Sequence, residues 1–257
     1  MSEQATSLES RHEVERRFHD ERMAGRQADE RDFYAVGGMD LVLNAYDASM
    51  GDVSGKTVLD FGCGDGARSL QYAKRGAIVY AFDISPESVR NLVKTATDAG
   101  LADRIHASVM PAETLAYPDG MFDLVLGVSI LHHTDVALVE REIQRVLKPG
   151  GRAIFIEPLA HNPFVRLFRL LTPNRRTPTE QPMTVAQIRH LIAQFREGRF
   201  RGFHLLSIMP PGLLWATGNR VLFQRTMGVT QTLDRWLLGV APPLRRYCWM
   251  TLIDVTK

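Results

Sequence analysis

The sequence predicts an α/β fold in which a doubly wound, mostly parallel sheet carries helices on both faces. Two observations lead to this prediction. Short apolar runs alternate with helical segments over residues 56–157, and such alternation requires crossover connections between parallel strands. The run 122–130 (FDLVLGVSI) is apolar nearly throughout, as in a strand that is covered on both faces. With 257 residues, 45% of them hydrophobic, the chain can bury one full core.

The first part of the chain divides into elements at clear boundary signals. Residues 8–35 are rich in Arg and Glu and predict one or two surface helices. Glycine or a Ser-Pro pair marks most of the later boundaries. The predicted strands are 56–62, 77–83, 104–110, 122–130 and 152–157, and the helices between them are 66–75, 85–99 and a segment that Asp135 caps.

The last third of the chain has a different pattern. Apolar residues at helical spacing predict a helix over 164–171, a Pro-rich loop follows at 172–182, and Thr184 caps a further helix. Segments 200–209 and 246–255 read as strands. The stretch of about 36 residues between them is too long for a hairpin turn, and its many Leu, Phe and Trp residues predict a helical insertion at 210–245.

Composition excludes several classes of protein. A net charge of +2 argues against a protein that coats nucleic acid. Cys63 and Cys248 lie far apart without a CxxC pair, so we expect no disulfide framework, no metal site and a cytoplasmic location. The N-terminal residues are too charged for a signal peptide. No apolar run approaches the roughly 18 residues of a membrane-spanning helix.

Polar residues gather at the ends of the predicted strands. Parallel strands bring their carboxyl ends to one edge, where doubly wound sheets bind ligands. Five strand ends converge on one crevice there, and they carry Asp60 with the glycines after it, Asp83, the segment after Met110, the segment after Ile130, and Glu157.

The glycine turn predicts a nucleoside cofactor. Glycine lets a backbone approach a ligand closely, and an acid about 20 residues further on can accept both ribose hydroxyls. A dinucleotide fingerprint reads G-x-G-x-x-G, whereas here Gly66 follows Gly62 and Gly64 one residue early. Asp60 would repel a pyrophosphate and attract an ammonium or sulfonium. A nicotinamide cofactor is therefore disfavoured against S-adenosylmethionine.

Four segments resemble class I S-adenosylmethionine-dependent methyltransferases of the branch that acts on small molecules and lipids. The matching segments are VLDFGCGDG, AFDIS, AETLAYPDGMFDLVLGVSILHHTD and EIQRVLKPGGRAIFIEP, and together they span roughly residues 40–160. The resemblance implies a seven-stranded Rossmann-like sheet whose last strand is antiparallel. Segments 200–209 and 246–255 would then supply the final pair.

The resemblance also implies roles for particular residues. Gly62, Cys63 and Gly64 would line the methionine part of the cofactor, and Asp60 would face its amino group. Asp83 would hold the ribose diol, with Ile84 on the adenine. The remaining implied contacts are Ala112 and Glu113 near the adenine edge and backbone carbonyls of Gly127 and Val128 toward the ammonium. Relatives often have an Asp where this chain has Pro111.

The acceptor is less well defined by the sequence. The Asn/Asp-Pro-Pro-aromatic motif of base-modifying enzymes is replaced by SILHHTD after the fourth strand, so nucleic acid is disfavoured. His132, His133 and His161 are candidate catalytic bases, against the alternative of structural packing or loop exposure. Glu157 also lies at the crevice, where it could contact a ligand; the alternative role for this side chain is a capping or loop hydrogen bond. Tyr34 is a candidate contact of the cofactor, against the alternative of surface packing. Arg175, Arg176 and Glu180 are candidates for a clamp on an acidic or sugar substrate, against the alternative of a solvated loop, which the sequence favours.

These expectations combine into one compact domain. Residues 1–40 form a helical lid, 41–160 the cofactor-binding core, and 161–257 complete the sheet and cover the substrate with helices at about 161–198 and 210–245. We predict methyl transfer from S-adenosylmethionine to a small or lipid-like acceptor, at oxygen. The alternatives are a NAD-dependent oxidoreductase and a cofactor-binding protein without methyl transfer. The apolar segment 210–245 contains interleaved arginines. Four roles are open for it: lining a substrate pocket, packing on the sheet, contacting a twin subunit, or touching a membrane surface. We expect the chain to be a monomer or a homodimer.

Overall fold

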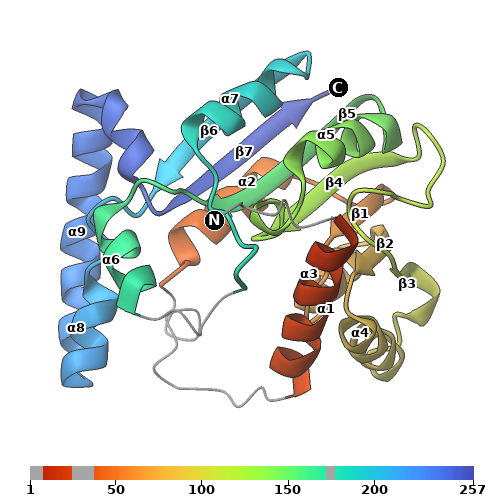
Figure 1. The fold of residues 1–257 in the computed structure, drawn as a ribbon, viewed down its shortest axis with the longest axis horizontal. Helices are drawn as coiled ribbons and strands as arrows, with labels where there is room; N and C mark the ends of the chain where they lie inside the picture. The colour runs from red at the N-terminus through yellow and green to blue at the C-terminus, as the bar shows by residue number, and fades with distance from the viewer. Residues whose placement is uncertain (1–7, 25–37, 172–176) are drawn as a thin grey trace, which may run out of the picture.

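The protein is built around one seven-stranded sheet. The computed structural model describes residues 8–24, 38–171 and 177–257 (Figure 1). The strand order is β3-β2-β1-β4-β5-β7-β6, and β7 is antiparallel to both of its neighbours. The predicted doubly wound, mostly parallel sheet with an antiparallel last strand is therefore confirmed. The strands are β1 (Thr57–Phe61), β2 (Ile78–Asp83), β3 (Ile105–Val109), β4 (Phe122–Val128), β5 (Leu147–Pro158), β6 (Glu197–Phe203) and β7 (Met250–Thr256).

Helices cover both faces of the sheet and create a separate apolar core on each. On one face Tyr46 and Leu92 are fully buried, and on the other Ile143 and Ile188 are buried. The described helices are α1 (Leu8–Ala24), α2 (Asp40–Met50), α3 (Ala67–Lys74), α4 (Pro86–Asp98), η1 (Ala102–Arg104), η2 (Leu131–His133), α5 (Val136–Val146), α6 (Pro163–Leu171), α7 (Val185–Ala193), α8 (Pro210–Thr217), α9 (Arg220–Val240) and η4 (Pro242–Tyr247).

Alternation along β1 explains how the sheet serves both cores and the site. Leu59 and Phe61 belong to the core beneath α5 and α7, whereas Val58 belongs to the core beneath α2 and α3. Because side chains alternate along a strand, Asp60 points to the same face as Val58. The buried acid thus lies at the carboxyl end of a central strand, next to the glycine turn.

Three predicted strands differ from the observed ones by several residues. The strand expected at 152–157 begins at Leu147, because Leu147 already pairs with Phe122 of β4 before a register shift in the ladder. The strand expected at 200–209 runs over Glu197–Phe203, because His204 has a φ of 62° and ends the extended backbone. The amide groups of Leu205, Leu206 and Ser207 donate to the Asp234 carboxylate instead of continuing the ladder. The strand expected at 246–255 begins only at Met250, because the residues before it lie in the η4 turn.

The segment between β6 and β7 consists of helices that extend the molecule at one end (Figure 1). Helices α8 and α9 pack on each other through a small buried cluster of Leu214, Phe223 and Met227. Among the described residues, no helix combines the length and the apolar character that crossing a bilayer requires.

Candidate cofactor and acceptor site

The glycine turn between β1 and α3 has a backbone that other residues rarely adopt. Gly62, Gly64 and Gly66 have φ angles of 75°, 52° and 77°. A Cβ on Gly62 would lie 2.7 Å from the Ile130 side chain, and one on Gly66 would lie 2.6 Å from Leu92. A Cβ on Gly64 would meet no described atom within 4 Å. Gly62 and Gly66 therefore allow close packing, whereas the backbone at Gly64 is open to a ligand.

Asp83 connects the end of β2 to this turn. One carboxylate oxygen accepts a hydrogen bond from the Gly64 amide at 2.8 Å, and the other accepts one from the Ser85 amide at 2.9 Å. The side chain is 8% exposed, and burial raises its pKa above the ordinary value although both amide bonds lower it. The predicted ribose-binding acid thus lies directly beside the open glycine.

Asp60 lies beneath the same turn and is 4% exposed. The Ser69 hydroxyl donates a hydrogen bond of 2.5 Å to its carboxylate. Burial raises the pKa of Asp60 to about 7, although the bond from Ser69 and the charge of Arg68 act to lower it. A positively charged ligand group beside Asp60 would favour the ionised carboxylate. Burial also raises the pKa of the neighbouring Cys63 thiol, so this side chain stays protonated and is a poor nucleophile.

Glu157 organises the turn that carries the two histidines. It is fully buried, and one oxygen accepts hydrogen bonds from the Ile130 and Leu131 amides at 2.9 and 2.8 Å. Its other oxygen lies 2.6 Å from Nδ1 of His132. The capping role considered for Glu157 is therefore what the structure shows. By holding Nδ1, Glu157 also fixes the orientation of the His132 ring.

His133 is paired with a carboxylate from α1, the helix that the sequence predicts as a lid. Its Nδ1 lies 3.0 Å from Oε2 of Glu15 on α1. The other oxygen of Glu15 accepts hydrogen bonds from the hydroxyl groups of Thr177 and Thr179. Burial acts to raise the pKa of Glu15, but His133 and the two hydroxyls together lower it to about 2. Helix α1 is thus joined to the loop after β4 and to the segment before α7.

Further contacts connect α1 to the rim of the crevice. Nε2 of His12 lies 2.9 Å from Glu113, whose second oxygen accepts a hydrogen bond from the Asp135 amide. Asp20 accepts a hydrogen bond of 2.5 Å from the Ser85 hydroxyl. In Figure 1, α1 crosses the end of the molecule that contains α3 and α4. Both carboxylate oxygens of Glu113 thus already have partners, one on α1 and one at the start of α5. If Glu113 contacts adenine, it does so with a carboxylate that also connects α1 to the rest of the structure.

In the part of the chain that the structure describes, two groups of side chains have the spacing of metal ligands. The ligand atoms of Glu15, His19 and His133 lie within 4.8 Å of one another, and so do those of His132, His133 and Glu180. Ion pairs explain the close approach of Glu15 to His133 and of Glu15 to His19. Either group could hold a divalent cation.

The remaining predicted residues have varied positions. Ala112 is buried, while Ile84 and Val128 are half-buried. Gly127 is packed so closely that a Cβ would lie 2.6 Å from the Phe155 ring. His161 is exposed on the turn between β5 and α6. Tyr34, Arg175 and Arg176 lie outside the described residues.

Sequence reasoning predicted a helical lid over residues 1–40 but did not identify its contacting residues His12 and Glu15, and it missed Ser69. His12, Glu15 and His19 are spaced three and four residues apart, which places them on one helical face. This ionisable stripe was the available signal for contact with the core. Nothing in the sequence connects it to Thr177 and Thr179, because that pairing depends on tertiary structure.

Comparisons with known proteins agree with this geometry. Residues 59–155 match the family model described as "Methyltransferase domain". Together with the strand order and the glycine turn, this match defines the core of the chain as a class I methyltransferase domain, and confirms the resemblance found in the sequence.

The curated relatives are small-molecule methyltransferases by name. The chain is 32% identical over 133 residues to the ubiquinone biosynthesis O-methyltransferase of Acinetobacter baylyi, covering 51% of this chain and 55% of the relative. It is 36% identical over 111 residues to aklanonic acid methyltransferase DauC of a Streptomyces species, covering 42% of this chain and 50% of the relative. The chain thus spans about half the length of the curated relatives that it matches.

Solved structures share the fold over more of the chain. Geranyl diphosphate C-methyltransferase from Streptomyces coelicolor, in complex with Mg²⁺, geranyl diphosphate and S-adenosylhomocysteine, has a TM-score of 0.64 at 14% identity, covering 96% of this chain and 97% of the other. The [4+2]-cyclase SpnF has a TM-score of 0.56 at 20% identity, covering 83% of this chain and 80% of the other. At these identities the similarity concerns the fold.

Proposed function

We propose that this chain transfers the methyl group of S-adenosylmethionine to an oxygen atom of a small, lipid-like acceptor. The observation that carries the proposal is a pair of buried carboxylates, Asp60 and Asp83, beside an open glycine turn in a methyltransferase domain. The names of the curated relatives support a small-molecule acceptor and transfer to oxygen.

The two carboxylates have complementary roles toward the cofactor. Asp83 accepts two amide hydrogen bonds and retains further lone pairs that can accept both ribose hydroxyls. Burial raises the pKa of Asp60 to about 7, and the ammonium of the bound cofactor would stabilise its ionised form. A nicotinamide dinucleotide would place its pyrophosphate against Asp60 and is disfavoured for that reason.

The cofactor supplies an activated methyl group, so the protein mainly aligns the reacting atoms and removes one proton. We assign His133 as the base, because Oε2 of Glu15 lies 3.0 Å from its Nδ1 and would stabilise the imidazolium that forms when Nε2 takes the acceptor's hydroxyl proton. Bound S-adenosylmethionine would supply the methyl carbon to the deprotonated oxygen, and the products would be the methyl ether and S-adenosylhomocysteine, with the proton on His133. His132, which is 6% exposed and held by Glu157, positions the turn.

The proposal also covers the cellular location and the oligomeric state of the protein. Both cysteines are buried free thiols, which supports a reducing, cytoplasmic environment. We propose that the chain works as a monomer or homodimer, with the lid residues of α1 closing the cofactor site within one chain.

A methyl-transfer assay with labelled cofactor tests this function. The acceptor is an alkyl-substituted catechol, and the matched control is the corresponding aniline. His133→Asn should lower kcat on the catechol by about 100-fold or more with little change in cofactor affinity, whereas the exposed His161→Asn should retain full activity.

The outcomes separate the alternatives. Tight calorimetric binding of S-adenosylmethionine without any methylated product from hydroxyl acceptors would support a cofactor-binding protein or a different reaction, as in the cyclase that shares the fold. Binding of NADH in place of S-adenosylmethionine would support an oxidoreductase. Loss of activity in His161→Asn instead of His133→Asn would move the base to the turn after β5.

A further inference from the structure

We infer that α6, α8 and α9 form a surface that docks on an anionic lipid membrane. Thirteen of the seventeen exposed large hydrophobic side chains in the described part of the chain lie on these helices or directly before α8. In Figure 1 the three helices gather at one end of the molecule, away from β3. We call this end the helical patch; its exposed apolar members are Phe164, Leu167, Phe168, Leu170, Leu171, Met209, Trp215, Val221, Leu222, Val229, Leu233, Trp236 and Val240.

Helix α9 has two apolar faces that point in different directions. Phe223 and Met227 are buried on the side that faces α8, together with Asp234. At 100° per residue, the exposed apolar residues of α9 occupy a separate sector of roughly 120° on the other side of the helix. That sector contains Trp236, which is 62% exposed. An apolar stripe this long on a solvent-facing side indicates an interaction surface.

Helix α6 also exposes apolar side chains to solvent, and none of its residues is buried. Asn162 caps its first turn by accepting hydrogen bonds from the Phe164 and Val165 amides. The rest of the helix exposes apolar residues, including Leu170 at 78%. A nine-residue helix with no buried face gains little stability from its own hydrogen bonds, so a partner that covers it would add substantially to its stability.

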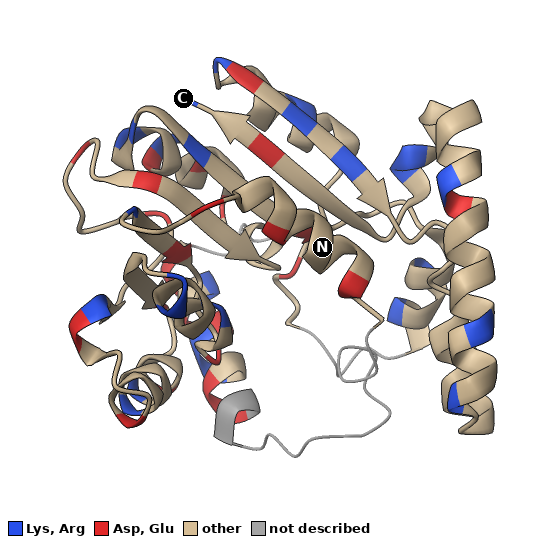
Figure 2. Ribbon diagram, turned by 180° about the vertical axis from the view of Figure 1, so that it is seen from behind, with Lys and Arg blue, Asp and Glu red and all other residues tan. Residues whose placement is uncertain are grey.

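The charges of the patch identify the partner. Helices α6, α8 and α9 and the adjoining η4 contain seven arginines and one acidic residue. The acid is Asp234, which is 3% exposed and accepts the amide hydrogen bonds of the β6–α8 loop. Figure 2 shows this end of the molecule as blue and tan with little red. The arginines are Arg166, Arg169, Arg220, Arg225, Arg235, Arg245 and Arg246.

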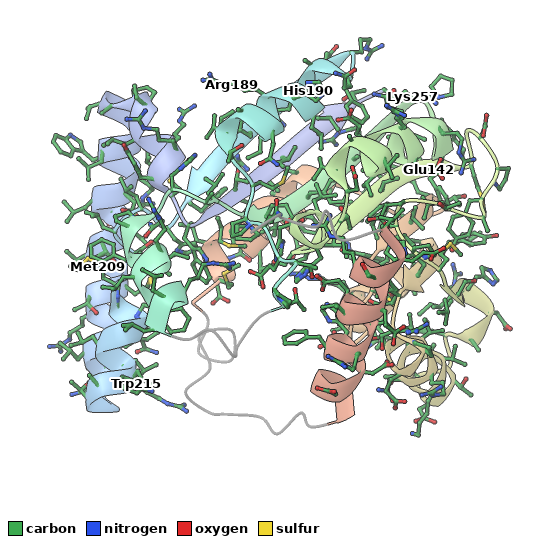
Figure 3. All side chains as sticks on the ribbon, in the orientation of Figure 1. Glu142, Arg189, His190, Met209, Trp215 and Lys257 are labelled. Carbon is green, nitrogen blue, oxygen red and sulfur yellow. The ribbon has the colours of Figure 1, made fainter. Side chains whose placement is uncertain are left out.

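Exposed apolar side chains beside cations of one sign match the interface of an anionic bilayer. Apolar groups enter the acyl boundary, arginines reach the phosphates, and tryptophans favour the headgroup region. Figure 3 shows the labelled Met209 and Trp215 at the end of the molecule that carries α8. A second copy of the chain fits less well, because a two-fold interface through this patch would place arginines against arginines.

The patch also reaches the candidate site. Arg169 of α6 forms an ion pair with Glu180, and the carboxylate of Glu180 lies within 4.8 Å of the ligand atoms of His132 and His133. A lipid-like acceptor that leaves the bilayer beside α6 would therefore arrive near the proposed base. The membrane contact itself does not depend on the proposed methyl transfer.

Vesicle co-sedimentation of the full chain tests the inference. We expect binding to phosphatidylcholine vesicles that contain phosphatidylglycerol, and little binding to phosphatidylcholine alone. Each arginine near the surface contributes about a fivefold effect, so Arg225→Gln combined with Arg235→Gln should lower the partition coefficient by about tenfold or more. Trp236→Gln should weaken binding similarly. The control is Val93→Gln on α4, since Val93 is 50% exposed and lies outside the patch.

Two control measurements distinguish a loss of vesicle binding from a folding defect. All substituted side chains are exposed, so the melting temperature and the calorimetric affinity for S-adenosylmethionine should stay unchanged in every variant. Quenching of tryptophan fluorescence by brominated lipids should be lost when Trp215 and Trp236 are both replaced by Phe. Three results would overturn the inference: no vesicle binding, binding that these variants leave intact, or a dimer in light scattering that they dissociate.

Discussion

Replacing Asp60 with Asn should stabilise the folded protein at neutral and alkaline pH while weakening cofactor binding. Asp60 is 4% exposed and accepts one hydrogen bond, from Ser69. Burial raises its pKa from 3.8 to about 7. An Asn side chain has nearly the same shape and keeps an oxygen that can accept the Ser69 hydroxyl, so the substitution removes the buried charge and little else.

The size of the effect follows from the pKa shift. One pKa unit corresponds to about 1.4 kcal/mol, so a rise from the ordinary value to about 7 corresponds to about 4 kcal/mol. Because the folded-state pKa is the higher one, the contribution of Asp60 to stability is fully present below the unfolded-state pKa and is lost as the pH rises to about 7. The advantage of Asp60→Asn should grow by roughly 1.4 kcal/mol per pH unit from about pH 4 and become constant above about pH 7.

Urea unfolding of the wild type and Asp60→Asn between acidic and alkaline pH measures this difference directly. Asp52→Asn is the matched control, because Asp52 is an exposed aspartate that also accepts one short-range hydrogen bond. A stability difference for Asp60→Asn that stays flat across this pH range would refute the reasoning, since it would mean that the folded protein ionises Asp60 as easily as the unfolded chain does.

The same carboxylate should make cofactor binding depend on pH. A bound ammonium favours the ionised form, so binding near pH 7 should release a proton, and affinity should rise as the pH approaches the pKa of Asp60. Calorimetry in two buffers with different ionisation heats measures the proton count. Asp60→Asn should bind more weakly and without this proton release. A residue that lowers stability but improves binding is expected at a functional site.

Three further predictions concern the turn, the ribose acid and the lid. Asp83→Ala should weaken binding of S-adenosylmethionine by about 10- to 100-fold, because charge-assisted hydrogen bonds contribute about 1.5–3 kcal/mol; unchanged calorimetric affinity would contradict the ribose assignment. Gly62→Ala should destabilise the protein more than Gly64→Ala in urea unfolding, because both have positive φ but only the Cβ at position 62 would lie 2.7 Å from Ile130; equal losses would remove the packing role of Gly62. Glu15→Gln should increase hydrogen exchange in α1 at least tenfold, because the ion pair with His133 is lost, whereas Glu9→Gln, at an exposed position of the same helix, should leave it unchanged; equal exchange in both would show that α1 is held by other contacts.

The core of the fold could be predicted because its signals are local. Ser85 and Pro86 define the start of α4, and Ser85 does accept the capping hydrogen bond from Ser88. Alternation of apolar runs and helices predicted that the first five strands run parallel, as the structure shows. The end of β6 could not be predicted in the same way, because it depends on the positive φ of His204 and on Asp234, a residue 30 positions further along the chain.

In the candidate site, too, the features set by local sequence could be predicted, whereas those set by distant residues could not. The glycine turn and Asp83 are close in sequence to their strands, and the structure brings them together through the Gly64–Asp83 hydrogen bond. The partners of His132 and His133 could not be foreseen, because Glu157 and Glu15 come from β5 and α1 and meet the histidines only in the folded chain. The sequence identified candidate bases, but only the structure distinguishes a histidine held by a buried core carboxylate from one held by the lid.

The segment 177–180 connects the lid to the helical patch. Thr177 and Thr179 donate to Glu15 of α1, and Glu180 pairs with Arg169 of α6. Glu15 also holds His133, so a displacement of α6 that moves this short segment changes the environment of the proposed base. The contacts that close the lid and the contacts that hold the patch are therefore not independent, because both depend on the same four residues of backbone.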